Sequence, residues 1–125
     1  MGIDIYAEWR NKPERERRAQ SEAWLSTRDG DIGYLREAYH GEPYATRFLF
    51  AEAFDSETCD VRIPAAQLRQ NLEKALELVE ERARNIYNAT DAEVEAEKQS
   101  FRDFVALCER KEMDTGEPVR IVASY

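Results

Sequence analysis

The chain is poor in the residues on which most metal and covalent sites depend. It holds one histidine, His40, and two cysteines, Cys59 and Cys108, which stand far apart in the sequence. A structural zinc site needs four cysteine or histidine ligands at short spacings, so we expect no metal site and no bound cofactor. The two cysteines are expected to be reduced thiols in the core or partly buried.

Long apolar runs and nucleotide-binding signatures are missing as well. No apolar stretch approaches the ~20 residues that span a bilayer, and MGIDIYAEWR at the start lacks the basic and apolar regions of a signal peptide. The sequence has no phosphate-binding loop, nucleophile elbow or dinucleotide-binding glycine fingerprint. These absences predict a cytoplasmic protein that does not bind membranes.

Positive charge is in the minority. The chain has 26 acidic and 18 basic residues, which gives a net charge of −8. Because nucleic-acid binding needs clustered lysine and arginine to neutralise phosphates, this balance argues against direct binding to DNA or RNA. At 125 residues the chain has the size of one domain, and we interpret residues 1–125 as a single α+β domain.

Strands are expected near both ends of the chain and in its middle. Residues 3–9 alternate apolar and polar side chains, which is the pattern of a half-buried strand. The last run, VRIVASY, alternates in the same way and is expected to pair with the first strand. YATRFLF (44–50) and TCDVRI (58–63) are interpreted as two further strands that form a hairpin.

Helices are predicted in two parts of the sequence. Asn11 as a cap and Pro13 in a first turn indicate a surface helix, anchored by Trp24 and Leu25. Pro64 then opens the longest apolar pattern, with steps of three and four residues along one helix face. The residues of this pattern are Leu68, Leu72, Leu76, Val79, Ala83 and Ile86.

A second helix is expected to follow the first after a short break. Thr90 with Glu93 three residues later matches a capping box, and a short connection favours an antiparallel pair. The whole pattern therefore predicts an α+β fold, in which a small, mainly antiparallel sheet packs against a long antiparallel helical hairpin at about residues 64–113.

The most chemically varied stretch is GYLREAYHGEPYATR, residues 33–47, with three tyrosines, two arginines, two glutamates and the only histidine. We expect residues 34–40 to be helical and to end at Gly41, which places an exposed arginine and histidine beside tyrosine rings. Guanidinium, imidazole and aromatic groups together suit a phosphate or nucleobase ligand. The candidate ligand-binding residues are Tyr34, Arg36, Tyr39, His40, Tyr44 and Arg47.

No catalytic residue is assigned from the sequence. In an enzyme, His40 is the expected acid–base group, and Glu37 or Glu42 is its partner or a base. A structural use of the same residues is equally compatible with the pattern, since tyrosines bury their rings, surface charges pair, and a histidine bonds carbonyls at a helix end.

Three blocks carry a resemblance to other proteins. MGIDIYAEW, GYLREAYHGEPYAT and RIPAAQLR, in this order, resemble a family of small uncharacterised bacterial and phage-associated proteins of similar length. The likeness extends over nearly the whole chain and is most specific at residues 33–46. It implies that the tyrosine, arginine and histidine block is the family's characteristic site, and it implies no activity.

Three functions compete on this evidence. The first is a binding protein of bacterial or phage origin that acts through the Gly33–Arg47 surface on a protein partner or a small anionic ligand; an anti-defence protein is one version of it. The second is a small enzyme or binder for a nucleotide-like or phosphorylated ligand, with His40 as the acid–base group. The third is a structural assembly subunit, for which a homodimer through the helical hairpin is the simplest form.

Overall fold

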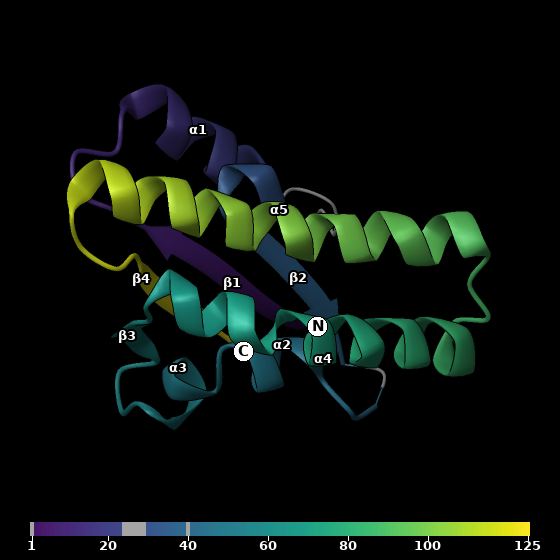
Figure 1. The fold of residues 1–125 in the computed structure, drawn as a ribbon. Coiled ribbons are helices and arrows are strands. Elements are labelled where there is room, and N and C mark those ends of the chain that lie inside the picture. The colour runs from purple at the N-terminus through teal and green to yellow at the C-terminus, as the bar shows by residue number, and fades with distance from the viewer. Residues whose placement is uncertain (1, 24–29, 40) are drawn as a thin grey trace.

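The computed structural model describes residues 2–23, 30–39 and 41–125, and within them the chain forms an α+β fold. The described strands form one antiparallel sheet, and two long helices lie side by side over it (Figure 1). The predicted fold class is therefore confirmed. The strands are β1 (Gly2–Glu8), β2 (Tyr34–Ala38), β3 (Asp60–Arg62) and β4 (Arg120–Ser124).

The sheet has the strand order β2-β1-β4-β3, with β1 antiparallel to both of its neighbours. Ile5 of β1 lies opposite Leu35 on one side and Ala123 on the other. The predicted pairing of the first and last strands is thus confirmed. Side chains of β1 alternate between a buried inner face, which turns to the long helices, and a half-buried outer face. The inner face of β1 carries Ile3, Ile5 and Ala7, and its outer face carries Asp4, Tyr6 and Glu8.

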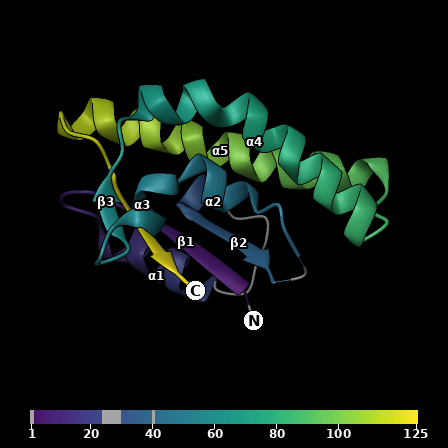
Figure 2. The same ribbon diagram turned by 90° about the horizontal axis from the view of Figure 1, so that it is seen from below.

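The two long helices are α4 (Ala65–Ile86) and α5 (Asp91–Thr115), which together cover the inner face of the sheet (Figure 2). The predicted helical hairpin is confirmed, as is its capping box: the Thr90 hydroxyl accepts from the Glu93 N–H, and the Glu93 carboxylate accepts from the Thr90 N–H. Leu72 and Leu76 are buried and belong to the core.

Shorter helices fill the remaining space. They are α1 (Glu14–Glu22), the 3-10 turn η1 (Gly30–Ile32), α2 (Ala45–Leu49) and α3 (Ala51–Asp55). α2 packs against α4, and α3 packs against β3 and β4. Gln20 joins α1 to the sheet by donating hydrogen bonds to the carbonyls of Ala7 and Gly33, at 3.0 and 2.8 Å.

The helix predicted for residues 34–40 is wrong. Tyr34–Ala38 is the edge strand β2, and its residues pair with β1 from Tyr6 opposite Tyr34 to Gly2 opposite Ala38. Gly41, with φ of 118°, lies in the turn after β2 and does not cap a helix. A five-residue segment has only a weak preference of its own, so the neighbouring strand decides its conformation.

The strand predicted for residues 44–50 is also wrong, and with it the hairpin to residues 58–63. Ala45–Leu49 forms α2, whose buried residues are Ala45, Thr46 and Leu49. Only the second predicted strand exists, as the short β3, which pairs with β4. A run of apolar residues this short does not distinguish a buried strand from a buried helical turn.

The predicted helix after Pro13 is confirmed, although its cap is not. Pro13 itself occupies the capping position of α1, and Asn11 lies in the preceding turn with φ of 59°. The expected anchors Trp24 and Leu25 lie outside the described residues. In the described part of the chain, no helix is long and apolar enough to cross a bilayer.

The two cysteines occupy different environments, and their reactivity is expected to differ. Cys108 is fully buried in the core, and burial raises the pKa of its thiol, whereas Cys59 is partly exposed. Because the thiolate is the reactive form, we expect an aromatic disulfide reagent to modify one thiol in the native protein and both after unfolding. Cys59→Ser should abolish modification of the native protein. Rapid modification of both thiols in the native protein would contradict the burial of Cys108.

Candidate functional site

The block predicted to be the site, residues 33–47, is divided between the two faces of the sheet. Tyr34 and Arg36 point to the outer face of β2, while Leu35 and Glu37 point to the inner face. Tyr39, Tyr44 and Arg47 come later, in the turn and on α2. His40 lies outside the described residues.

On the outer face, Tyr34 and Arg36 bind one carboxylate, that of Asp4 on β1. The Arg36 guanidinium donates to both Asp4 oxygens at 2.8 and 3.0 Å, and the Tyr34 hydroxyl donates to one of them. The Tyr34 ring is fully buried and lies 5.2 Å from the Tyr6 ring. These two predicted ligand-binding residues therefore join β2 to β1.

On the inner face, Glu37 organises the start of α2. Its buried carboxylate accepts from the N–H groups of Ala45 and Thr46 at 2.9 and 3.1 Å, and from the Thr46 hydroxyl. The first N–H groups of a helix have no partner within the helix, so a carboxylate at that end stabilises it. Glu37, one of the two glutamates considered as a base or as a partner of His40, is thus engaged in holding α2 against the sheet.

A buried arginine that the sequence analysis missed completes this arrangement. Arg82 of α4 donates to the carbonyls of Ala38 and Gly41, and its Nε lies 3.9 Å from the Glu37 carboxylate. Its guanidinium also lies 4.7 Å from the centre of the Tyr44 ring. The signal was present in the sequence, because position 82 falls on the apolar stripe of the helix, where a charged residue is unusual.

A cavity of about 260 Å³ lies between β2, the last turns of α4 and the first turns of α5. Its polar walls are engaged: Arg36 binds Asp4, Glu37 caps α2, Arg82 holds two carbonyls, and the Glu93 carboxylate accepts from the N–H of Thr90. Since each of these groups already has a partner, the cavity does not offer the open anion cradle that the sequence suggested.

The rest of the block contributes to a surface that we call the aromatic patch. Its members are Tyr39, Tyr44, Arg47, Phe54 and Tyr125. The rings of Tyr39 and Tyr44 meet edge to face at 6.3 Å, the Arg47 guanidinium lies 5.6 Å from the Phe54 ring, and the Phe54 and Tyr125 rings are 4.9 Å apart. The patch therefore combines side chains from the turn after β2, from α2 and α3, and from the end of β4.

Tyr125 connects the two halves of the aromatic patch. The pKa of its hydroxyl is raised, first by the hydrogen bond from the Cys59 thiol, at 3.6 Å, and then by burial. Arg47 and Tyr39 both lie near enough to act on this hydroxyl electrostatically, in opposite directions. β4 packs against α3, and in Figure 1 the end of β4 lies near α3.

The aromatic patch has exposed members over a buried ring, that of Phe54, and the chain segment that supplies most of it is acidic. Tyr39 is 38 % exposed and Tyr125 is 57 % exposed, and Phe48 on α2 is exposed as well. The surrounding segment, residues 41–57, has four acidic side chains against Arg47 alone. These acidic residues are all exposed, and one of them, Glu52, accepts a hydrogen bond from Gln67: Glu42, Glu52, Asp55 and Glu57.

The structure thus brings together Tyr39, Tyr44 and Arg47 of the predicted site and places Tyr34 and Arg36 on the opposite face. Phe54 and Tyr125 were not predicted as site residues. No local motif marks them, because their neighbours in the aromatic patch are distant in the sequence. Within the described residues no group of three or more histidine, cysteine, aspartate or glutamate side chains has the arrangement of a metal site.

Known proteins give no direct guide to this site. Comparisons with protein-family models, with curated proteins and with solved structures find no match to the chain.

Proposed function

We propose that the protein binds another protein through the aromatic patch, and that the partner presents a basic surface with an apolar centre. The observation that carries the proposal is the exposure of Tyr39 and Tyr125, with Arg47 and Tyr39 both close to the Tyr125 hydroxyl. Tyrosine and arginine are enriched among residues that dominate protein–protein binding energy, and aromatic rings give large contact areas at low cost in side-chain entropy.

The charge around the aromatic patch indicates the kind of partner. Residues 41–57 carry a net charge of −3, and the chain as a whole carries −8. Complementary charge speeds encounter and selects the partner, so a basic surface is favoured over an acidic one. A second copy of this chain is disfavoured at this surface, because a twofold interface would bring two acidic segments together.

A protein partner suits the geometry better than a small phosphorylated ligand at the Gly33–Arg47 surface. A phosphate cradle there needs Arg36 free, and Arg36 is paired with Asp4. An acid–base role for Glu37 needs a free oxygen lone pair directed at a substrate, and both of its oxygens bind α2. An anti-defence protein that covers a basic groove on its target is one form that such binding takes.

Selection of peptides from a displayed random library tests this function without a known partner. We expect the purified protein to select peptides with net positive charge and at least one aromatic or large aliphatic residue. Tyr39→Ala/Tyr125→Ala should weaken their binding about tenfold or more, because two exposed anchors are removed. Affinity should also fall as the salt concentration rises from about 0.05 to 0.5 M.

The matched control is Ile86→Ala/Met113→Ala, which removes two exposed apolar side chains outside the aromatic patch. It should bind the selected peptides as the unchanged protein does. Selection of acidic peptides, equal loss in the control variant, full binding by the Tyr39/Tyr125 variant, or no selectable peptide at all would each contradict the proposal.

A further inference from the structure

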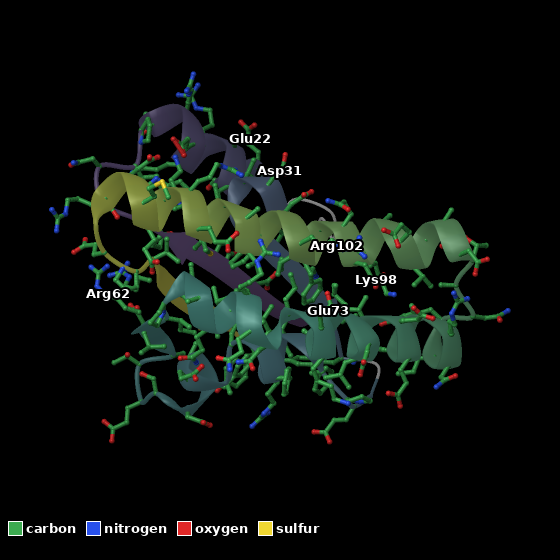
Figure 3. All side chains as sticks on the ribbon, in the orientation of Figure 1. Glu22, Asp31, Arg62, Glu73, Lys98 and Arg102 are labelled. Carbon is green, nitrogen blue, oxygen red and sulfur yellow. The ribbon has the colours of Figure 1, made fainter. Side chains whose placement is uncertain are left out.

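A second surface gathers positive charge at the other end of β4 from the aromatic patch. It is a hollow of about 310 Å³, which we call the arginine hollow. Figure 3 shows one member, Arg62, at the margin of the molecule where β3 and β4 lie near the end of α5. The hollow is lined by Glu8, Trp9, Arg10, Arg17, Arg62, Glu117 and Arg120.

The lining of the arginine hollow is unusual for so acidic a chain. Four guanidinium groups and two carboxylates line it, and with Asp60, which binds Arg120, the local excess is one positive charge in a chain of net charge −8. The side chains of Arg10, Arg62 and Arg120 are 60, 50 and 49 % exposed, so they are open to a ligand from solvent. Exposed charges of one sign in a concave surface raise the local concentration of the opposite ion.

Three of the four arginines have carboxylate partners, but unlike the partly buried Arg36–Asp4 pair these ion pairs are exposed and individually weak, so an anion can compete with them. Glu117 binds Arg10 at 2.9 Å through one oxygen and Arg62 at 3.5 Å through the other. Asp60 binds Arg120 at 3.2 Å. The remaining carboxylate of the lining, that of Glu8, binds Lys12 at 3.2 Å. The way in which Glu117 bridges two guanidiniums shows how an anion is held in this hollow.

Strand pairing adds a second, independent observation. Arg62 of β3 lies directly opposite Arg120 of β4 in the antiparallel register. Like charges at directly opposite positions destabilise a sheet, because their β-carbons are only about 5 Å apart. Asp60, which binds Arg120, and Glu8, which lies opposite Arg120 on β1, offset part of this repulsion, and a bound anion between the two guanidiniums would offset the rest through charge-assisted hydrogen bonds.

Two lysines, each paired with a glutamate, flank the tryptophan of the hollow. The Trp9 ring forms one wall, and the Nζ atoms of Lys12 and Lys111 lie 4.3 and 4.9 Å from the ring centre. Arg17 donates its Nε–H to the Lys12 carbonyl at 3.2 Å, which fixes that side chain over the hollow. The tryptophan indole also supplies an optical signal for anything that binds beside it.

We propose that the arginine hollow binds a diphosphate group, carried by inorganic pyrophosphate or by a small phosphorylated molecule. A guanidinium matches phosphate oxygens in a fork geometry, and a diphosphate carries enough charge and oxygens to engage arginines on both sides of the hollow. A nucleic-acid strand needs a continuous run of basic contacts, and four arginines in one hollow of an acidic chain engage only a few phosphates.

Titration of the full chain with defined anions tests the proposal. The probes are pyrophosphate, ADP, adenosine and a single-stranded oligonucleotide, with binding followed by calorimetry and by Trp9 fluorescence in a Trp24→Phe background. We expect saturable pyrophosphate binding that weakens with salt, and no binding of adenosine. Equal affinity for pyrophosphate and ADP identifies the diphosphate as the whole ligand, and tighter ADP binding identifies a nucleoside contribution; both support the site.

Two charge-matched variants locate the binding. Arg62→Gln/Arg120→Gln should weaken pyrophosphate binding at least about tenfold, because two charge-assisted contacts are lost. Arg69→Gln/Arg102→Gln, which removes the same charge from α4 and α5, should bind within about twofold of the unchanged chain. Circular dichroism confirms that both variants fold; if the first does not, Arg10→Gln/Arg17→Gln replaces it with the same expected loss.

The proposal is overturned by any of three results. One is the absence of pyrophosphate binding at millimolar concentration. Another is an equal affinity of the hollow variant and its control. The third is an oligonucleotide that binds more tightly than pyrophosphate and loses affinity in the same hollow variant, since the surface would then be a nucleic-acid site. None of these results bears on the aromatic patch, because its binding is tested separately with the selected peptides.

Discussion

Glu37→Ala is expected to lower the free energy of unfolding by about 3–5 kcal/mol, as removal of one partner from a buried charged pair typically does. The substitution leaves the N–H groups of Ala45 and Thr46 without their acceptor at the start of α2. It also leaves the buried Arg82 guanidinium without the nearby carboxylate, 3.9 Å from its Nε. Urea unfolding followed by circular dichroism measures the loss.

Two other substitutions make the Glu37 result specific. Glu37→Gln keeps one oxygen to accept hydrogen bonds and fills the same volume, so its cost should be about 1–3 kcal/mol. Glu73→Ala, at an exposed position on α4, should change stability by no more than about 0.5 kcal/mol. A loss below about 1 kcal/mol for Glu37→Ala would show that the carboxylate does not hold α2.

The Glu37 result also bears on the proposed function. α2 carries Arg47 and Phe48, and its first turn is fixed to the sheet through Glu37. If α2 shifts when this anchor is lost, the aromatic patch is disordered with it. We therefore expect Glu37→Ala, at temperatures where it remains folded, to bind the selected peptides more weakly than Glu73→Ala does.

Gly30→Ala is expected to destabilise the fold by about 3 kcal/mol or more, at the upper end of the cost of overpacking a core. An added β-carbon would lie 1.8 Å from the Ser100 carbonyl oxygen and 2.7 Å from its carbon. These atoms belong to the backbone of α5, so they do not move aside as a side-chain end would. Either η1 must leave α5 or the helix must distort. Thermal unfolding by calorimetry measures the effect.

The control for Gly30→Ala is Gly116→Ala. Gly116 has no atom within 4 Å of an added β-carbon, but its φ of 76° is unfavourable for other residues. The cost there should be only about 1–2 kcal/mol, from backbone strain alone. If the two variants are equally stable, the close approach of η1 to α5 is not as tight as the structure describes.

Local patterns determined the largest elements of this fold. A helix is stabilised by hydrogen bonds between residues four apart, and its buried face repeats at the same spacing. The apolar stripe from Leu68 to Ala83, the capping box at Thr90, and Gly116 after the end of α5 are therefore all visible in the sequence. The alternation in β1 and β4 is visible for a similar reason, since one face of each strand is buried.

Short segments were predicted less well because their conformation depends on distant residues. Residues 34–38 contain helix-forming and strand-forming side chains alike, and pairing with β1 makes them a strand. α2 exists where its buried face meets α4 and where the Glu37 carboxylate accepts its first N–H groups. Neither partner is apparent from the five or so residues concerned.

The sequence by itself determined that this is an acidic α+β protein with a helical hairpin over an antiparallel sheet, and that residues 33–47 are rich in polar aromatic chemistry. The tertiary structure alone decided how that chemistry is divided. Tyr34, Arg36 and Glu37 serve internal contacts, while Tyr39, Arg47 and Tyr125 are exposed, the last two against the buried ring of Phe54. Likewise, only strand pairing brings Arg62 opposite Arg120, because side chains distant in sequence become neighbours only when the chain folds.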